Sequence, residues 1–174
     1  LKETKPDNYA HEYLGEVTGT GGEVFRNVTI RPITDEEIKG FWNIKRGLDF
    51  GYAIDPLSYG VMHYDRKKKR LYIFHEYYGV GISNRTLAQH ILSENRNNEP
   101  VYADSAEPKS INEIRQYGVR IVPVKKGPDS IEFGIKFLQD LEEIIIDDTR
   151  CPETAREFLT YELEKDANGN FKAG

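Results

Sequence analysis

Cysteine is almost absent from this sequence, which has a single one, Cys151, among 174 residues. One cysteine excludes an internal disulfide and any metal site built from several cysteines, and it is compatible with a reducing cytoplasm. Long apolar runs are absent as well, since no stretch is long enough to cross a membrane, and no signal-peptide pattern occurs. We therefore expect a domain without a membrane partner.

A strong excess of charge of one sign is also missing. The sequence has 24 lysines and arginines against 29 aspartates and glutamates, and its formal net charge is −5. This balance argues against a uniformly basic nucleic-acid-binding protein. Positive charge is concentrated locally in the run RKKKR at residues 66–70. A solvated hairpin turn is the favoured interpretation of this run, and contact along a DNA duplex is the alternative.

A phosphate-binding loop for ATP is absent too. The pattern G-x-x-x-x-G-K-[ST] does not occur in the chain, and the stretch KKGPDS at residues 125–130 does not replace it. We therefore do not expect this chain to bind and hydrolyse ATP through such a loop.

Hydrophobic residues make up 38% of the sequence, which is enough for the core of one compact domain. Short polar turns separate three apolar segments, which we expect to form an antiparallel meander over residues 46–52, 57–64 and 71–78. Helical and strand patterns then alternate, with helices predicted over 84–95, 108–118, 128–143 and 152–164 and strands over 100–104, 119–124 and 144–147. This order predicts an α/β fold with a mixed central sheet, an antiparallel three-strand meander plus parallel strands, flanked by helices.

The first forty residues do not share this regular pattern. A glycine-rich stretch at residues 19–22 is followed by short apolar patches, which is typical of a linker or a lead-in strand. Thr34 can cap a short helix whose first residues are acidic. We expect residues 1–40 to form a lead-in segment and residues 41–174 to form one domain, truncated at its carboxyl end.

Two acids lie where strands are predicted. Asp49 lies between Leu48 and Phe50 in the first strand of the meander, and Asp104 ends the strand over residues 100–104. The carboxyl ends of parallel strands meet at one edge of a sheet, so Asp49 and Asp104 come face to face if these strands pair. Close carboxylates repel unless a cation lies between them, and Mg²⁺ and Mn²⁺ prefer such oxygen ligands. The alternative for Asp104 is a turn or helix cap.

Two lysines follow the strand predicted over residues 119–124. Lys125 and Lys126 precede a predicted helix, and helix amino termini attract phosphates. Contact with a DNA backbone is therefore one interpretation, and an ordinary solvated loop is the other. We interpret His63, His75 and His90 as packing or surface residues, because nothing in the sequence pairs them with Asp49.

The motifs around both acids resemble the nuclease domain of the phage terminase large subunit, the motor protein that cuts and packages viral DNA. Three stretches carry the resemblance in matching order and spacing: RGLDFGYAIDP (46–56), VYADSAEPKSINEIR (101–115) and VKKGPDSIEFGIKFLQ (124–139). The resemblance implies a ribonuclease H-like fold. It also implies a metal-dependent endonuclease that cleaves concatemeric double-stranded DNA by two-metal phosphodiester hydrolysis.

By motif position, the resemblance makes Asp49 and Asp104 the first and second metal ligands, with two Mg²⁺ or Mn²⁺ ions as cofactors. It implies as partners double-stranded DNA, the ATPase domain of the same full-length protein, the small terminase subunit and the portal protein. The implied location is the cytoplasm of the infected bacterial host.

The resemblance also implies a third acid, on a helix near the carboxyl end in a segment that contains histidine and aspartate. No such segment occurs in this sequence, and none of the late acids matches the motif: Asp147, Asp148, Glu162, Glu164 and Asp166. We expect the third acid to lie beyond residue 174.

Two other functions stay open at this point. The missing third acid favours a catalytically silent module that docks on DNA or on a portal. Phosphate binders of the actin or sugar-kinase type also share an opening strand with an aspartate followed by a glycine, as in DFGYA at residues 49–53. Those proteins need a second homologous domain, for which 174 residues leave no room.

Overall fold

The structure is a computed structural model that describes residues 24–51 and 55–161, together with short strand segments at 2–3, 5–6, 163–165 and 171–173. Two of the sheets are two-stranded antiparallel pairs, β1 (Lys2–Glu3) with β2 (Lys5–Pro6) and β10 (Leu163–Lys165) with β11 (Phe171–Ala173). In the described part of the chain, no helix has the length and apolar character that a membrane span requires.

Seven strands form the main sheet, in the hydrogen-bonded order β3-β9-β6-β5-β4-β7-β8. The bounds of the strands are β3 Val28–Ile30, β4 Ile44–Asp49, β5 Leu57–Asp65, β6 Arg70–Gly79, β7 Val101–Asp104, β8 Ile121–Val124 and β9 Glu143–Ile146. The helices are α2 Asp35–Lys39, α3 Asn84–Glu94, α4 Pro108–Gln116, α5 Ser130–Gln139 and α6 Pro152–Thr160. Antiparallel and parallel strands occur together with flanking helices, which confirms the predicted fold class.

The chain forms two compact units, which we describe separately. The first unit comprises Leu1–Asn43, His63–Phe74 and Pro128–Gly174, and the second comprises Ile44–Met62 and His75–Gly127. Strands β5 and β6 contribute residues to both units.

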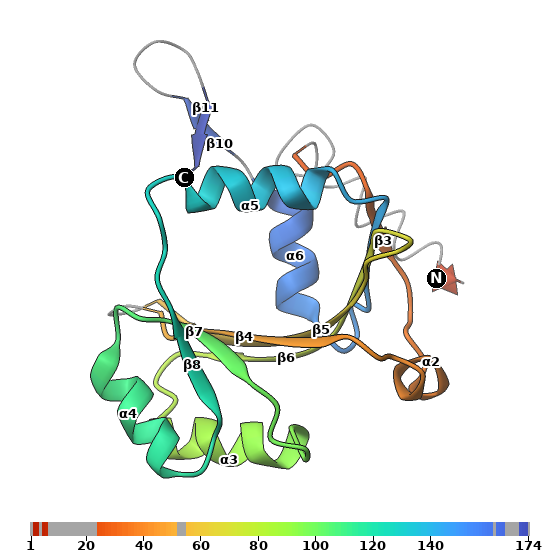
Figure 1. Cartoon of the computed structure of the whole chain (residues 1–174). Coiled ribbons are helices and arrows are strands. Elements are labelled where there is room, and N and C mark those ends of the chain that lie inside the picture. The colour runs from red at the N-terminus through yellow and green to blue at the C-terminus, as the bar shows by residue number, and fades with distance from the viewer. Residues whose placement is uncertain are drawn as a thin grey trace. The chain divides into compact units, whose positions relative to one another are not determined.

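In the second unit, β4 pairs in parallel with β7, and β7 pairs in parallel with β8. Helices α3 and α4 lie together along one side of β7 and β8 (Figure 1), and Asn84 of α3 donates to the hydroxyl of Ser110 and the carboxylate of Glu113 on α4. Pro123 lies in β8, the last strand of the sheet, where a missing backbone donor costs least. Buried side chains of these strands and of the two helices form the core of this unit: Leu48, Leu87, Ile91, Val101, Ala103, Ile111, Ile114 and Ile121.

A buried charge cluster ties β4 to α3 and to the segment after it. The Arg46 side chain is only 8% exposed and pairs with Glu94 at 3.0 Å and with Glu99 at 2.5 Å. The Tyr59 hydroxyl donates to Glu94, and burial together with this bond raises the Tyr59 pKa. A buried guanidinium is stable only when its charge and its donors are satisfied, so Arg46 depends on both carboxylates.

In the first unit, β9 pairs in parallel with both β3 and β6. Helix α6 contacts β3, and the Phe25 ring packs on Phe158 of α6 with 5.0 Å between ring centroids. Thr34 caps α2 as predicted, because its side chain accepts from Glu37 N while the Glu37 carboxylate accepts from Thr34 N. Residues 28–30 and 35–39 of the predicted lead-in segment thus form β3 and α2, and the domain boundary at residue 41 stays a prediction.

The predicted elements exist, but several of their ends differ. Helix α5 begins at Ser130 and ends at Gln139, shorter than the predicted 128–143, and the last predicted residue, Glu143, is part of β9. Helix α6 stops at Thr160, since Tyr161 has an extended backbone. Strand β4 ends at Asp49 rather than at residue 52, so the acid belongs to the strand as predicted but is its last residue and not a mid-strand one.

Candidate active site

Asp49 and Asp104 are the last residues of the neighbouring parallel strands β4 and β7. The register pairs Gly47 with Tyr102 and Leu48 with Ala103, so the next position brings Asp49 beside Asp104. Adjacent strands are about 4.8 Å apart, and paired residues of parallel strands face the same side of the sheet. The pairing of these two strands, which was the condition for the two acids to meet, is therefore present, and both residues lie at one edge of the second unit.

The backbone of each following loop orients its acid. Asp49 Oδ1 accepts from Gly51 N at 3.0 Å, and Asp104 Oδ1 accepts from Ala106 N at 3.0 Å. This is the turn geometry that was the alternative interpretation of Asp104. The turn uses only one carboxylate oxygen of each residue. Asp49 is exposed and the Asp104 side chain is 32% exposed, so a second oxygen of each can face a ligand.

Gly51 is required by the backbone behind Asp49. Its φ of +71° lies in the left-handed region, and a Cβ there would lie 2.6 Å from the carbonyl oxygens of Asp55 and of Pro56. Both conditions exclude an ordinary side chain. The position of Gly51 N, which holds Asp49 Oδ1, thus depends on the residue having no side chain.

We expect Gly51→Ala to lower the free energy of unfolding by more than about 1 kcal/mol, because alanine cannot adopt this conformation without strain. Chemical denaturation measures the change. Gly47→Ala is the matched control, since a Cβ at Gly47 in β4 meets no atom within 4 Å. Equal stability of the two variants would contradict the steric role of Gly51.

Lys126 lies at the same edge as the acids. Its Nζ is 3.5 Å from Asp104 Oδ2, and the Lys126 side chain is 60% exposed. Lys125 is exposed beside it. The helix that follows, α5, has Asp129 at its amino-terminal cap and Glu132 in its first turn, and both acids disfavour a phosphate at that helix end. The sequence suggested two phosphate-binding features, the two lysines and the amino terminus of the following helix. Only the lysines therefore remain candidates.

The two carboxylates suit a hard divalent cation. Each has one oxygen held by a backbone amide and a second that can coordinate, and Mg²⁺ is commonly bound through one or two carboxylates while it keeps several waters. Within the described residues, however, no group of three His, Cys, Asp or Glu side chains is close enough to hold a metal ion. The site therefore provides two ligands and lacks a third among those residues.

Asp147, one of the late acids, has a structural role. It is 4% exposed, and its carboxylate accepts from the backbone N–H groups of Ile33 at 2.8 Å, Thr149 at 3.0 Å and Arg150 at 3.1 Å. The Arg150 guanidinium adds an ion pair at 3.3 Å. These partners use the oxygens that a metal would need.

The other late acids provide no assigned ligand. Asp148 is half-buried in the first unit. Glu162 and Asp166 lie outside the described residues, and of Glu164 only its place in strand β10 is described. The position of the third acid stays a prediction.

Sequence reasoning missed a histidine pair in the second unit. His75 Nε2 of β6 and His90 Nε2 of α3 are 2.8 Å apart, and the Tyr77 ring stacks on His90 with 4.0 Å between centroids. Burial, and then the charge of His75, lower the His90 pKa. The two histidines are on different elements, so no local pattern could indicate their contact.

Comparison with known proteins finds that the chain is similar to large terminase subunits of phages. The family described as "Terminase RNAseH like domain" matches residues 49–173. The large terminase subunit of Bacillus phage SPP1 is 42% identical over 166 residues, which is 93% of this chain and 39% of that protein. The PBSX phage terminase large subunit of Bacillus subtilis (strain 168) is 32% identical over 174 residues, covering 97% of this chain and 40% of that protein.

A solved structure agrees with these relatives. The crystal structure of the g2p (large terminase) nuclease domain from bacteriophage SPP1, with bound Mn, matches with a TM-score of 0.80 and 40% identity, covering 84% of this chain and 85% of that one. The chain spans about two fifths of the length of the curated relatives it matches.

Proposed function

Because this chain belongs to the terminase ribonuclease H-like domain family, we propose that it is a divalent-metal-dependent endonuclease that cleaves concatemeric double-stranded DNA. One observation carries the proposal: the parallel register of β4 and β7 sets Asp49 beside Asp104 at the carboxyl edge of the sheet. Ligands of open α/β sheets collect at this edge. The SPP1 nuclease domain, 40% identical, is described with bound Mn.

Asp49 and Asp104 would hold the cations through the oxygens that their turns leave open. A pair of bound Mg²⁺ or Mn²⁺ ions supplies an activated water and stabilises the leaving oxygen during phosphodiester hydrolysis. Gly51 N and Ala106 N keep the two carboxylates oriented, which limits the reorganisation needed on binding.

Lys125 and Lys126 are the residues we assign to the DNA backbone. Both are exposed, and the ion pair of Lys126 with Asp104 shows that its ammonium reaches the edge where the acids lie. A cation that neutralises Asp104 frees Lys126 for a phosphate, because the lysine then loses its partner charge. Contacts of this kind position a duplex and do not read its sequence.

The partners that we propose follow from the relatives, which are large terminase subunits more than twice as long as this chain. They are an ATPase domain of the same full-length protein, a small terminase subunit and a portal protein, in the cytoplasm of an infected bacterium. The family assignment removes the basis for an actin- or sugar-kinase-like phosphate binder, since the match begins at Asp49 of the DFGYA stretch.

Cleavage of a supercoiled plasmid tests the proposal. We expect Mn²⁺ or Mg²⁺ to convert the plasmid to open-circular and linear forms, and we expect EDTA to abolish the conversion, because the carboxylates alone cannot activate water. The assay uses the full-length protein, so that a third ligand from outside the described residues can take part. Metal-independent cleavage, or none at all, would refute the proposal.

A catalytically silent docking module is the second candidate, favoured by the lack of a third ligand among the described residues. DNA binding without cleavage in the same assay would support it. Thermal unfolding with and without Mn²⁺ separates the two candidates further, because only a metal site raises the melting temperature with metal concentration.

A further inference from the structure

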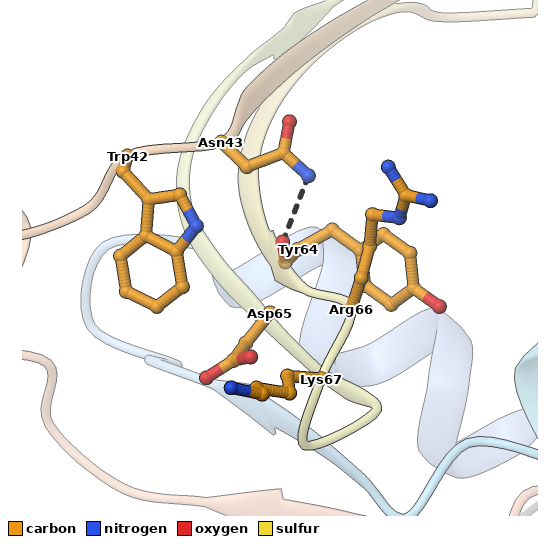
Figure 2. A pocket seen from close by; sticks show the side chains of 6 residues that line it. All are labelled: Trp42, Asn43, Tyr64, Asp65, Arg66 and Lys67. Atoms are coloured by element: carbon orange, nitrogen blue, oxygen red, sulfur yellow. Dashed lines mark hydrogen bonds between the residues drawn. The ribbon is translucent and has the colours of Figure 1, made fainter.

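A pocket in the first unit has no role in the proposed cleavage. It has a volume of about 640 Å³ and is lined by Trp42, Asn43, Tyr64, Asp65, Arg66 and Lys67. Figure 2 shows Trp42 on one side of the pocket and the Tyr64 and Arg66 side chains on the other. Asp49 and Asp104 belong to the second unit. The volume is within the range of sites for small molecules.

Trp42 is exposed yet held in place. Its side chain is 69% exposed, and its ring meets the buried His63 ring edge-on with 4.4 Å between centroids. Phe41 stacks on His63 at 4.3 Å, so the imidazole is fixed between its two neighbours. An exposed indole contributes little hydrophobic stabilisation to the free protein. An indole that is already held in place also loses little conformational entropy when a ligand binds.

The backbone beside Trp42 is fixed as well. Asn43 N donates to His63 Nδ1 at 3.3 Å, the Asn43 amide donates to Tyr64 O at 2.9 Å (Figure 2), and Tyr64 N donates to Asn43 O at 3.0 Å. Three hydrogen bonds thus hold Asn43 against His63 and Tyr64, which makes the backbone here rigid. The backbone next to the indole is therefore held in place before any ligand arrives.

Positive charge also lines the pocket, at Arg66 on the side opposite Trp42 and at Lys67 (Figure 2). Arg66 and Lys67 are exposed, as are Lys68 and Lys69 after them. Among the described residues, no acidic side chain forms an ion pair with any of these four. In a chain with a net charge of −5, four unpaired cations on a single turn create a local positive field.

The hairpin turn that carries these cations has a defined shape. Asp65 Oδ1 accepts from Lys68 N at 3.1 Å, and Lys69 O accepts from Glu142 N at 2.9 Å. Lys69 itself has a φ of +55°. A solvated turn, the favoured interpretation from the sequence, accounts for the charges but not for this rigidity or for the fixed indole beside them.

We propose that this pocket binds an unstacked nucleobase together with its phosphate. The base stacks on Trp42, Arg66 and Lys67 neutralise the phosphate, and the Asp65 carboxylate offers an acceptor to an exocyclic amino group. Aromatic stacking combined with a cationic track is how proteins hold single-stranded nucleic acids. The same chemistry has two sources, a free mononucleotide or an unpaired stretch of a nucleic-acid strand.

The test uses the intrinsic fluorescence of Trp42, which is the single tryptophan of the chain. The full chain is titrated in EDTA, so the result does not depend on cleavage, with dAMP, with a single-stranded 12-mer and with the corresponding duplex. We expect the single strand to quench the emission. Quenching by dAMP at similar concentration assigns the pocket to free nucleotides, and quenching by the oligomer alone assigns it to a strand.

Variants separate stacking from charge. Trp42→Ala is expected to weaken binding of a fluorescein-labelled single strand by about 5-fold or more, since one stacked base contributes about 1–3 kcal/mol. The pair Arg66→Gln and Lys67→Gln should lower the slope of log affinity against log salt by about 0.7, for the one phosphate that these side chains neutralise on a single strand. Phe133→Ala, which removes a 75% exposed aromatic outside the pocket, is the control and should bind normally.

Two results would overturn the proposal. One is the lack of any quenching of Trp42 by both the nucleotide and the single strand. The other is equal affinity for the single strand and the duplex, together with no change in either affinity in Trp42→Ala. The cations would then bind phosphates without any contribution from base stacking. A failure of metal-dependent cleavage affects neither result, so the two proposals are tested independently.

Discussion

Asp49→Asn is expected to reduce metal-dependent nicking by at least about 100-fold. Loss of a group that merely orients a metal ligand lowers metal affinity or activity by up to about 100-fold. Asp49 is proposed as a ligand itself, so its loss should cost at least as much. Asparagine keeps the oxygen that accepts from Gly51 N but removes the negative charge that attracts the cation. Asp104→Asn should have the same effect, because Ala106 N keeps its acceptor there. Initial rates of plasmid nicking at several Mn²⁺ concentrations measure the loss.

The metal-free stability of these variants provides an independent readout. Two adjacent carboxylates repel each other, so removing one charge should leave the melting temperature in EDTA unchanged or raise it. Added Mn²⁺ should then stabilise the parent protein more than either variant. Asp140→Asn is the control, since Asp140 is an exposed acid of the first unit that pairs with Lys136. Nicking by Asp49→Asn at the parental rate would exclude Asp49 from the metal site.

Arg46→Ala is expected to lower the free energy of unfolding by about 3–5 kcal/mol, the usual cost of removing one partner of a buried ion pair. The guanidinium is 8% exposed and the Glu94 side chain is 18% exposed, so the substitution leaves Glu94 with an uncompensated charge in a poorly solvated place. Glu99, which is 45% exposed, can turn to water and adds less. Urea denaturation followed by circular dichroism measures the change.

Two further variants isolate the cause. Arg85→Ala removes an exposed arginine of α3 and should change stability by less than about 0.5 kcal/mol. Adding Glu94→Gln to Arg46→Ala should restore part of the lost stability, because the stranded charge is then gone. If the double variant is less stable than Arg46→Ala alone, the cost comes from lost packing of the arginine stem and not from Glu94.

Much of the secondary structure was predictable because its signals are local. Ser83 and Thr34 were predicted to begin helices, and in the structure each accepts from the backbone N–H of the third residue after it. The left-handed backbone of Gly118, at φ +105°, follows α4 as expected. The ends of α5 and β4 were predicted poorly, since apolar residues continue beyond each element and only tertiary pairing decides where it stops.

The two acids could be identified from the sequence, but the contacts between distant residues of the second unit could not. Asp49 and Asp104 are 55 residues apart in the chain, and they were expected to meet only if β4 and β7 paired in parallel. Long-range contacts between different elements leave no local periodicity, so the sequence did not indicate the binding of Arg46 to Glu94 or the contact of His75 with His90. The structural role of Asp147 was hidden for the same reason.

The element types, the helix caps and the pair of acids follow from the amino-acid sequence alone, because each depends on residue chemistry over a few positions. The matching motifs were also enough to indicate the family, since their order and spacing are properties of the chain itself. Three facts come from the fold instead: the two acids are adjacent, Gly51 has no room for a side chain, and Trp42 is fixed beside a cationic turn. These facts depend on strand register and on contacts between distant residues, which no local pattern encodes.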